Sequence, residues 1–381
     1  MKTKLVYAVS EDWYFLSHRL AMAEAAKQAD YEIHVLCNDT GKIGLINSMG
    51  FSCHLINFSR KSWSPIKLIF EIILFINLLK KIKPDILHLV SIRPIIVGGI
   101  ASKFYKIPIK ICAMTGLGHI FTSKSIIKRL VRNLFVPLLR FSVKGNIIQI
   151  LVQNKDDFEL MENLSIANKS DITLIRGSGI DINYYKPLAL PLEPPIVVGF
   201  VSRMLEDKGA GLVIQAAKII RDETLNIKFL LAGKLDDQNP TSLNYSDIIN
   251  AHDSGYINWL NEVADVREVW KQSHIAVLPS RREGLPKSLM EAAASRRCLI
   301  ASDVPGCREI ALDGINAILI PPDNVTALVK AIKTLAYDKN LRINYAMESR
   351  KLVESDLSSE IVGKLTVSMY QKLEYANKDK S

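Results

Sequence analysis

The sequence lacks the features that mark several common classes of protein. Its five cysteines are scattered with no C-x-x-C pair, so no zinc site is indicated, and their apolar neighbours suggest buried thiols in a reducing compartment. The most apolar run, residues 68–79, contains Glu71 and Asn77 and is shorter than the roughly 20 residues that a membrane-spanning helix requires. The apolar segment after Met1-Lys-Thr-Lys is too short for a signal peptide and predicts a first strand. We therefore expect a cytoplasmic protein.

Acidic residues are scarce in one part of the chain. Residues 51–150 carry 16 lysines and arginines but only 2 aspartates and glutamates. Residues 1–190 hold 25 basic and 14 acidic side chains, and the remainder holds 24 and 25. This asymmetry indicates an anionic partner for the N-terminal half, either nucleic acid or a membrane surface.

Short apolar runs alternate with amphipathic stretches along the 381 residues, which are enough for two domains. The predicted strands are residues 4–10, 31–37, 86–90, 109–114, 147–153, 171–175, 196–202, 228–233, 256–260 and 274–278. The alternation predicts an α/β protein with doubly wound parallel sheets. The opening strand–helix–strand unit lacks G-x-G-x-x-G, so the common dinucleotide fingerprint is absent. A proline-rich stretch, residues 188–195, predicts a stiff linker between domains 1–187 and 196–355.

The stretch from Leu278 to Glu291 is the strongest candidate for a ligand site. After the strand, Gly284 permits a tight turn and Pro286 suits the first position of a helix. Unpaired N–H groups at that helix start favour an anion such as a diphosphate. Glu283 and Glu291 beside it indicate that the ligand also carries hydroxyls, as a sugar nucleotide does. Alternatively, the two carboxylates only complement the helix dipole.

Two cations, Arg203 and Lys208, lie five residues apart where a predicted strand leads into a helix. Arginine offers a planar fork and lysine a point charge, a combination that suits a diphosphate. The alternative is that both are simply solvated.

Together these blocks resemble the retaining glycosyltransferases of family 4. The resemblance rests on the Glu283-x7-Glu291 spacing, the alanines that follow it, and residues 303–310 and 313–316. It covers nearly the whole chain. It implies the GT-B fold, in which two Rossmann-like doubly wound domains face each other across a cleft. It also implies that the first domain binds the acceptor, the second binds the nucleotide sugar, and a C-terminal helix, residues 356–381, crosses back to the first domain.

The resemblance implies roles for individual residues. Arg203 and Lys208 would bind the donor diphosphate and stabilise the leaving nucleotide. Glu283 would hold sugar hydroxyls, and Glu291 would bind the ribose. The other implied donor-binding residues are Gly233, Gly284, Leu285, Pro286 and Lys287. No metal or cofactor is expected beyond the UDP-sugar substrate, because protein cations take the place of a metal, and front-face transfer is favoured because no second carboxylate is placed for a covalent mechanism.

Two loops of the first half are candidates for contacts with sugar or acceptor. One is residues 10–15, after which Ser17-His18-Arg19 opens a predicted helix, and the other, after strand 109–114, reads Thr-Gly-Leu-Gly-His. Similar loops occur in the branch of family 4 that builds bacterial surface polysaccharides, such as O-antigen and capsule, on lipid carriers. By that resemblance the sugar-facing residues are His18, Thr115, Gly116 and Gly118, with His119 catalytic. The alternative for His18 is a capping or packing role, and the alternative for His119 is a structural hydrogen bond.

Two predicted helices of the first half carry several basic residues. Residues 65–83 predict an amphipathic helix whose final lysines are explained by the helix dipole. Residues 123–145 combine apolar side chains at helical spacing with six lysines and arginines and no acid, although Pro137 should kink or break the run. A helix of this second kind commonly lies on an anionic bilayer. Burial of its apolar stripe in the core is the alternative.

The sequence departs from the family pattern behind the candidate site. Arg296 and Cys298 stand where the family usually has glycine and proline, and Asn316-Ala317 stands where Asn-Gly is usual. Arg296 must therefore end its helix without the ease of glycine in the left-handed conformation.

The charge distribution and the basic helix support a membrane-peripheral protein on the inner face of the plasma membrane. The resemblance implies a transferase that moves a hexose or N-acetylhexosamine from a UDP-sugar to a polyprenyl-diphosphate-linked saccharide. One alternative is a UDP-sugar 2-epimerase of the same fold. The other is a non-catalytic nucleic-acid-binding protein, although the basic half lacks a known reader motif.

Overall fold

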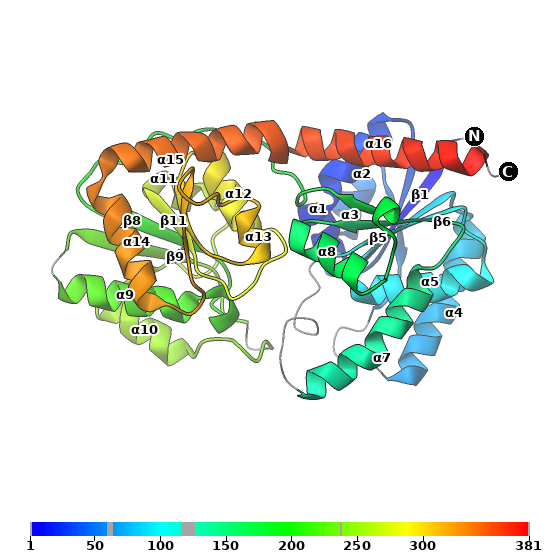
Figure 1. Ribbon diagram of the computed structural model, residues 1–381, viewed down its shortest axis with the longest axis horizontal. Coiled ribbons are helices and arrows are strands. Elements are labelled where there is room, and N and C mark those ends of the chain that lie inside the picture. The colour runs from blue at the N-terminus through cyan, green and yellow to red at the C-terminus, as the bar shows by residue number, and fades with distance from the viewer. Residues whose placement is uncertain (1, 59–63, 116–125, 224, 237, 380–381) are drawn as a thin grey trace. The chain divides into compact units, whose positions relative to one another are not determined.

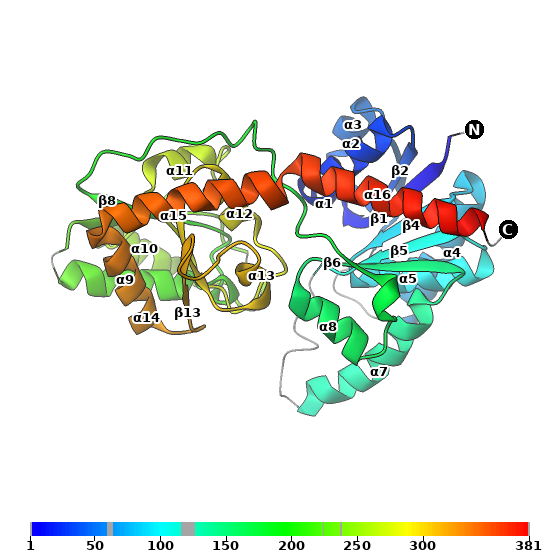
Figure 2. The same ribbon diagram turned by 45° about the horizontal axis from the view of Figure 1, so that its top comes forward.

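The computed structural model describes residues 2–58, 64–115, 126–223, 225–236 and 238–379, with no side-chain description for residues 126–134. The chain divides into two compact units. The first contains Met1–Gly179 and Ser359–Ser381, and the second contains Ile180–Ser358. Each unit is built on one parallel sheet covered by helices (Figures 1 and 2).

The first unit has a 7-stranded parallel sheet with the strand order β3-β2-β1-β4-β5-β6-β7. Its elements are β1 (Lys4–Glu11), α1 (Asp12–His18), α2 (Leu20–Gln28), β2 (Glu32–Asn38), α3 (Ile43–Ser48), β3 (Ser52–Leu55), α4 (Pro65–Ile82), β4 (Ile86–Val90), α5 (Ile92–Phe104), β5 (Ile109–Ala113), α7 (Ile126–Val143), β6 (Ile147–Val152), α8 (Lys155–Asn163), β7 (Ile172–Leu174) and α16 (Ser359–Lys378).

The two faces of this sheet carry separate cores. Successive residues of a strand point to opposite faces, so Val6 and Ala8 of β1 pack with α4, α5 and α7, while Leu5, Tyr7 and Val9 pack with α1, α2 and α16. Because helices cover both faces, the central strands are buried and mostly apolar, with His88 of β4, Lys110 of β5 and Gln149 of β6 as buried polar exceptions.

The last helix of the chain, α16, belongs to the first unit, where it runs along α2 (Figure 1). A Cβ atom on Gly363 would lie only 2.7 Å from the Cβ of Ala25, so glycine permits this close crossing. At the buried side of α16 the Tyr370 hydroxyl lies 2.7 Å from the Tyr7 hydroxyl and 2.7 Å from Nδ1 of His88. Burial lowers the pKa of His88, which therefore stays neutral in this cluster.

The second unit has a 6-stranded parallel sheet with the order β10-β9-β8-β11-β12-β13. Its elements are β8 (Ile196–Val201), α9 (Ala210–Asp222), β9 (Ile227–Ala232), α10 (Tyr245–Asp253), β10 (Asn258–Trp259), α11 (Arg267–Gln272), β11 (Ile275–Leu278), α12 (Lys287–Ala294), β12 (Cys298–Ser302), α13 (Pro305–Arg308), β13 (Ala317–Ile320), α14 (Val325–Tyr337) and α15 (Lys339–Leu352).

The boundary between the units differs from the predicted one, since residues 180–195 belong to the second unit. Ile180 and Tyr185 are part of its core. The buried guanidinium of Arg297 donates to the carbonyl oxygens of Leu188 (3.2 Å) and Ala189 (2.9 Å). The prediction ended the first domain at residue 187, because the proline content of residues 188–195 indicates a stiff linker. Proline content does not reveal which side chains bind that segment.

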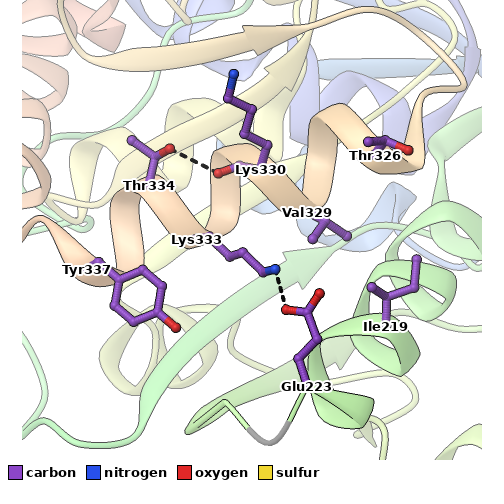
Figure 3. A pocket seen from close by; sticks show the side chains of 8 residues that line it. All are labelled: Ile219, Glu223, Thr326, Val329, Lys330, Lys333, Thr334 and Tyr337. Atoms are coloured by element: carbon purple, nitrogen blue, oxygen red, sulfur yellow. Dashed lines mark hydrogen bonds and ion pairs between the residues drawn. The ribbon is translucent and has the colours of Figure 1, made fainter.

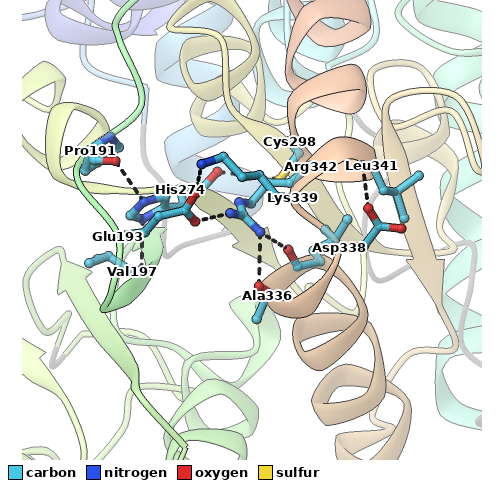
Figure 4. A network of polar contacts seen from close by, with 11 residues as sticks. Pro191, Glu193, Val197, His274, Cys298, Ala336, Asp338, Lys339, Leu341 and Arg342 are labelled. Carbon is cyan, nitrogen blue, oxygen red and sulfur yellow. Dashed lines mark hydrogen bonds and ion pairs between the residues drawn. The ribbon is translucent and has the colours of Figure 1, made fainter.

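A second set of contacts fixes the rest of the proline-rich stretch, residues 188–195 (Figure 4). Glu193 forms ion pairs with Lys339, at 2.7 Å, and with the buried Arg342. Nδ1 of His274 accepts from the N–H of Val197 at 3.0 Å, so its Nε2 carries the proton that is donated to Pro191 O at 3.2 Å. Burial lowers the pKa of His274, consistent with this neutral tautomer. These contacts therefore hold residues 188–195 against the second unit.

Pro137 lies inside α7 without ending the helix, which continues to Val143. Phe135, Val136 and Leu139 are buried in the core, so the second half of α7 supports the burial alternative. Arg140 donates to the backbone carbonyl of Leu164. Within the described ranges, no helix is both long and apolar enough to span a bilayer.

Candidate active site

The strand order of each sheet reverses at one point, between β1 and β4 in the first unit and between β8 and β11 in the second. In open parallel sheets, ligands bind beyond the carboxyl ends of the strands at such a point. Arg203 and Lys208 follow β8, and Glu283 follows β11. The predicted donor-site residues of the second unit therefore gather where the fold favours a ligand.

Lys208 and Glu283 form a close ion pair, with 2.6 Å between Nζ and Oε1. Ser280, which is fully buried, donates its hydroxyl to the same carboxylate oxygen at 2.7 Å. Within the described chain, Oε2 of Glu283 has no hydrogen bond, so it can accept one from a ligand. The side chains of Glu283 and Lys208 are 8% and 25% exposed, so the ammonium retains access to solvent.

Two glycines allow three backbone segments to meet around this pair. Gly209 has a φ of +78°, and a Cβ there would lie 2.3 Å from the carbonyl oxygen of Pro279. A Cβ on Gly306 would lie 2.3 Å from the carbonyl oxygen of Gly284 and 2.6 Å from that of Glu283. Only glycine fits at either position, so both sides of the loop that carries Glu283 are fixed by backbone contact.

The helix after this loop starts one residue later than predicted. Pro286 is the N-cap residue of α12, with φ −74° and ψ 118°, and Lys287 is the first helical residue. Over the part of the chain that the structure describes, no side chain caps this helix start. The N–H groups of its first turn are therefore available to an anion. Leu285, just before the N-cap residue, packs against the core of the second unit and so fixes the end of the loop that carries Glu283.

Glu291 is buried within α12, and the hydroxyl of Tyr185 donates to its Oε1 at 3.0 Å. Burial raises the pKa of Glu291, while the ammonium of Lys287, 3.8 Å from Oε1, acts in the opposite direction. Sequence reasoning missed Tyr185, because nothing in its local pattern shows that it approaches a helix more than a hundred residues away. Its hydroxyl orients one oxygen of Glu291.

Gly233, predicted to bind the donor, has a clear structural role. Its φ is +145°, and a Cβ there would lie 1.8 Å from the carbonyl oxygen of Ser202 at the end of β8. The N–H of Gly233 donates to the carbonyl oxygen of Asn261 at 2.7 Å, and the indole N–H of Trp259 donates to the carbonyl oxygen of Gly233 at 2.9 Å. Gly233 thus fixes the backbone beside Arg203, whose guanidinium forms an ion pair with Asp236.

Arg296 adopts the left-handed conformation that the sequence required of it, with a φ of +61°. Its N–H donates to Ala293 O and that of Arg297 donates to Ala292 O, both at 3.0 Å. This is the Schellman pattern that normally uses glycine.

In the first unit, His18 and Thr115 lie after strands β1 and β5. The His18 ring stacks on Tyr14 with centroids 4.3 Å apart, and its Nδ1 lies 2.6 Å from the Ser17 hydroxyl. Thr115 Oγ1 lies 3.0 Å from Oγ of Ser91, which has a φ of +75°. The other predicted residues of this unit, Gly116, Gly118 and His119, lie outside the described residues.

Asp12 is a buried carboxylate that sequence reasoning did not single out. It accepts hydrogen bonds from the backbone N–H groups of Thr40 and Lys42, each at 2.8 Å, and from that of Trp13 at 2.7 Å. Burial alone would raise the pKa of Asp12, but the hydrogen bond from the Thr40 hydroxyl and these backbone hydrogen bonds together outweigh it and lower the pKa. Asp12 therefore ties the loop after β2 to the start of α1.

Asp157, in the first turn of α8 after β6, gives a testable pH dependence. Burial raises its pKa to about 6, against the hydrogen bond from Asn154. The unfolded chain has a pKa of about 3.9 for aspartate, so the contribution of Asp157 to stability is fully present below pH of about 4 and is lost as pH rises through about 6. We expect Asp157→Asn to flatten the fall in unfolding free energy over this window, measured by urea titration. Glu159→Gln, an exposed change on the same helix, should leave the fall unchanged; an equal slope in D157N would contradict the assignment.

A surface pocket of about 520 Å³ lies between α9 and α14 (Figure 3). Its lining residues are Ile219, Glu223, Thr326, Val329, Lys330, Lys333, Thr334 and Tyr337. Glu223 and Lys333 are paired with each other across it. Among the predicted site residues that the structure describes, none lines this pocket.

Two family models match the chain. Residues 4–154 match the model described as glycosyl transferase 4-like, and residues 195–338 match the model described as glycosyl transferases group 1. Together they span most of both sheets.

Three curated relatives match over most of their length. The N,N'-diacetylbacillosaminyl-diphospho-undecaprenol alpha-1,3-N-acetylgalactosaminyltransferase of Campylobacter jejuni is 26% identical, over 87% of this chain and 91% of that protein. The capsular polysaccharide biosynthesis glycosyltransferase CapM of Staphylococcus aureus is also 26% identical, over 91% of both chains. An Escherichia coli UDP-Gal:alpha-D-GlcNAc-diphosphoundecaprenol alpha-1,3-galactosyltransferase is 23% identical, over 84% of both.

Solved structures share the architecture. Sucrose-phosphate synthase from Thermosynechococcus elongatus gives a TM-score of 0.80 at 16% identity, covering 98% of this chain and 100% of that one. Anabaena HepE, in complex with UDP, gives 0.76 at 15% identity, with the same coverage. At these identities the likeness concerns the fold.

Proposed function

Because the chain belongs to the group 1 glycosyltransferases, with a glycosyl transferase 4-like first domain and the GT-B fold, we propose the following reaction. The protein transfers a hexose or N-acetylhexosamine, with retention, from a UDP-sugar to a polyprenyl-diphosphate-linked saccharide during bacterial surface polysaccharide synthesis. The observation that carries this proposal is the convergence of Lys208, Ser280 and Glu283 beside the start of α12, which no side chain of the described residues caps.

The relatives support the substrate classes in this proposal. The names of the Campylobacter jejuni and Escherichia coli enzymes specify acceptors on diphospho-undecaprenol, and the latter name specifies a UDP-sugar. The HepE structure contains UDP. All three curated relatives are named as glycosyltransferases, so the epimerase and nucleic-acid-binding alternatives gain no support from them.

In the proposed reaction, negative charge develops on the diphosphate as the bond to the anomeric carbon breaks. Lys208, Arg203 and the first-turn N–H groups of α12 stabilise that charge, a contribution of roughly 3–4 kcal/mol per well-placed donor. Lys208 binds Glu283 through Oε1, which leaves Oε2 to accept a hydrogen bond from a sugar hydroxyl. The carboxylate thereby holds the sugar while its partner ammonium stabilises the leaving group. Glu291, held by Tyr185, binds the ribose hydroxyls.

The first unit would bind the acceptor. Its candidates for contact with acceptor or sugar remain His18, Thr115, Gly116, Gly118 and His119. No bound cofactor or metal is part of this proposal. Since the proposed acceptor is embedded in the membrane, the protein would work at the inner face of the plasma membrane, peripherally attached.

A donor panel tests the proposal. Purified protein is incubated with UDP-, GDP- and TDP-sugars and a lipid-diphosphate disaccharide, and nucleotide release and glycolipid products are measured. We expect UDP release from one donor, coupled to product formation, and loss of both in Glu283→Ala. Interconversion of donor sugars without transfer would favour the epimerase, and transfer from a GDP- or TDP-sugar alone would contradict the UDP assignment.

A further inference from the structure

Helix α4 of the first unit exposes apolar side chains on the face turned away from the core. Their exposed fractions are Ile66 68%, Ile69 56%, Phe70 69%, Ile73 51% and Leu74 42%. These positions recur at intervals of three and four residues, so they form one continuous stripe on the helix. The opposite face, with Phe75, Leu79 and Ile82, is buried in the core of the unit. Helix α4 therefore has apolar side chains on both its buried and its exposed side, but the first unit covers only the buried side.

The charges on the exposed side of α4 all have one sign. Lys67, Lys80 and Lys81 are exposed, and the face continues past the apolar stripe through Asn77 to the two terminal lysines. The single carboxylate of the helix, Glu71, is instead buried and pairs with both Nε (2.9 Å) and Nη2 (2.8 Å) of Arg93 on α5. The surface thus presents an apolar stripe and cations without an acidic group of its own.

We propose that this face of α4 docks the protein on an anionic lipid bilayer, with the apolar stripe at the boundary of headgroups and acyl chains and the lysines on the headgroup phosphates. An apolar stripe with lysines around it fits that boundary, where burial depth is about 5–10 Å. A second copy of the chain fits the same face poorly, because a two-fold contact would bring the terminal lysines of both copies into one interface. Nucleic acid would use the lysines but leave the stripe uncovered.

The position of the apolar stripe on α4 supports the proposal. The functional reason for docking rests on the proposed function, in which the acceptor is lipid-linked. As the crossover helix between β3 and β4, α4 begins at the carboxyl edge of the sheet and runs toward the amino edge. The apolar half, from Ile66 to Leu74, is therefore the half nearer the strand ends that carry Ser91 and Thr115. Docking by this half would bring that edge of the first unit close to a membrane-embedded acceptor.

Vesicle binding without any acceptor tests docking alone. We expect wild type to co-sediment with vesicles of phosphatidylglycerol and phosphatidylethanolamine, and F70S/I73S to bind roughly tenfold or more weakly. K80E/K81E should weaken binding by a similar factor, and high salt should reduce the difference. The matched control is L365S/Y375S, which removes two exposed side chains (48% and 70%) from α16, on the opposite face of the sheet. That control should bind as wild type.

Transfer to a water-soluble short-chain prenyl-diphosphate saccharide separates this inference from the proposed function. F70S/I73S should match wild type on the soluble acceptor and fall behind on the same saccharide embedded in vesicles. Wild type that does not bind vesicles, binding that F70S/I73S leaves unchanged, or a dimer in solution that F70S/I73S abolishes would overturn the docking role. Stripe-dependent vesicle binding without any transfer would instead sustain docking and refute the proposed reaction.

Discussion

Replacing Lys208 or Glu283 with alanine is expected to lower the rate of sugar transfer by roughly 100- to 1000-fold each. The reason is geometric: Nζ of Lys208 and Oε1 of Glu283 are 2.6 Å apart, so each positions the other. Groups that act as one unit have non-additive effects. The double variant K208A/E283A should therefore be no more than about tenfold slower than the worse single variant, as measured by initial rates at saturating donor.

An exposed ion pair of the second unit provides the control for this comparison of single and double variants. Lys234 and Glu262 are 3.3 Å apart, with side chains 58% and 68% exposed. Surface pairs of this kind contribute little, so K234A/E262A should stay within about twofold of wild type. If the losses in K208A and E283A instead multiply in the double variant, the two side chains act independently and the coupled mechanism is wrong.

Gly233→Ala is expected to destabilise the second unit by about 3 kcal/mol or more. Two causes combine: a φ of +145° is a conformation that side chains rarely adopt, and the new Cβ would lie 1.8 Å from the carbonyl oxygen of Ser202. The backbone of β8 or β9 must therefore shift. Urea unfolding followed by circular dichroism measures the loss.

Gly255 gives the matched comparison. It also has a positive φ, +74°, but nothing lies within 4 Å of a Cβ built there. Gly255→Ala should lower the unfolding free energy by only about 1 kcal/mol, because alanine disfavours a positive φ but meets no steric overlap there. Equal effects of the two substitutions would show that the overlap with Ser202 is relieved without cost and that Gly233 is not needed for packing.

The family and the fold class could be predicted from the sequence, and the comparisons confirm both. The reason is that the signals are local: alternating apolar runs mark the strands, and the spacing of Glu283 and Glu291 places them around one helix start. The resemblance assigned Arg203, Lys208 and Glu283 to one donor site, and in the structure they follow β8 and β11, the neighbouring strands at which the strand order reverses. The roles of these residues stay predictions.

Contacts between distant segments could not be predicted. Tyr185 binds Glu291, and Arg297 anchors residues 188–189, yet neither has a local pattern that reveals its partner. For the same reason the boundary was placed after residue 187. The membrane hypothesis was attached to residues 123–145, because their basic amphipathic pattern is visible in sequence. In α4 apolar residues occur on all sides, and only tertiary packing decides which of them remain exposed.

The route of the chain through the two units has a consequence for biosynthesis. The core under α1 and α2 needs Val362, Met369 and Tyr370 of α16, which are synthesised only after the whole of the second unit. The second unit, by contrast, is made from the continuous segment 180–358. During translation the middle of the protein can therefore complete its fold before the beginning does, reversing the usual N-terminal-first order. Until α16 has left the ribosome, the nascent first unit keeps an apolar face uncovered, and chaperones can bind it during this period.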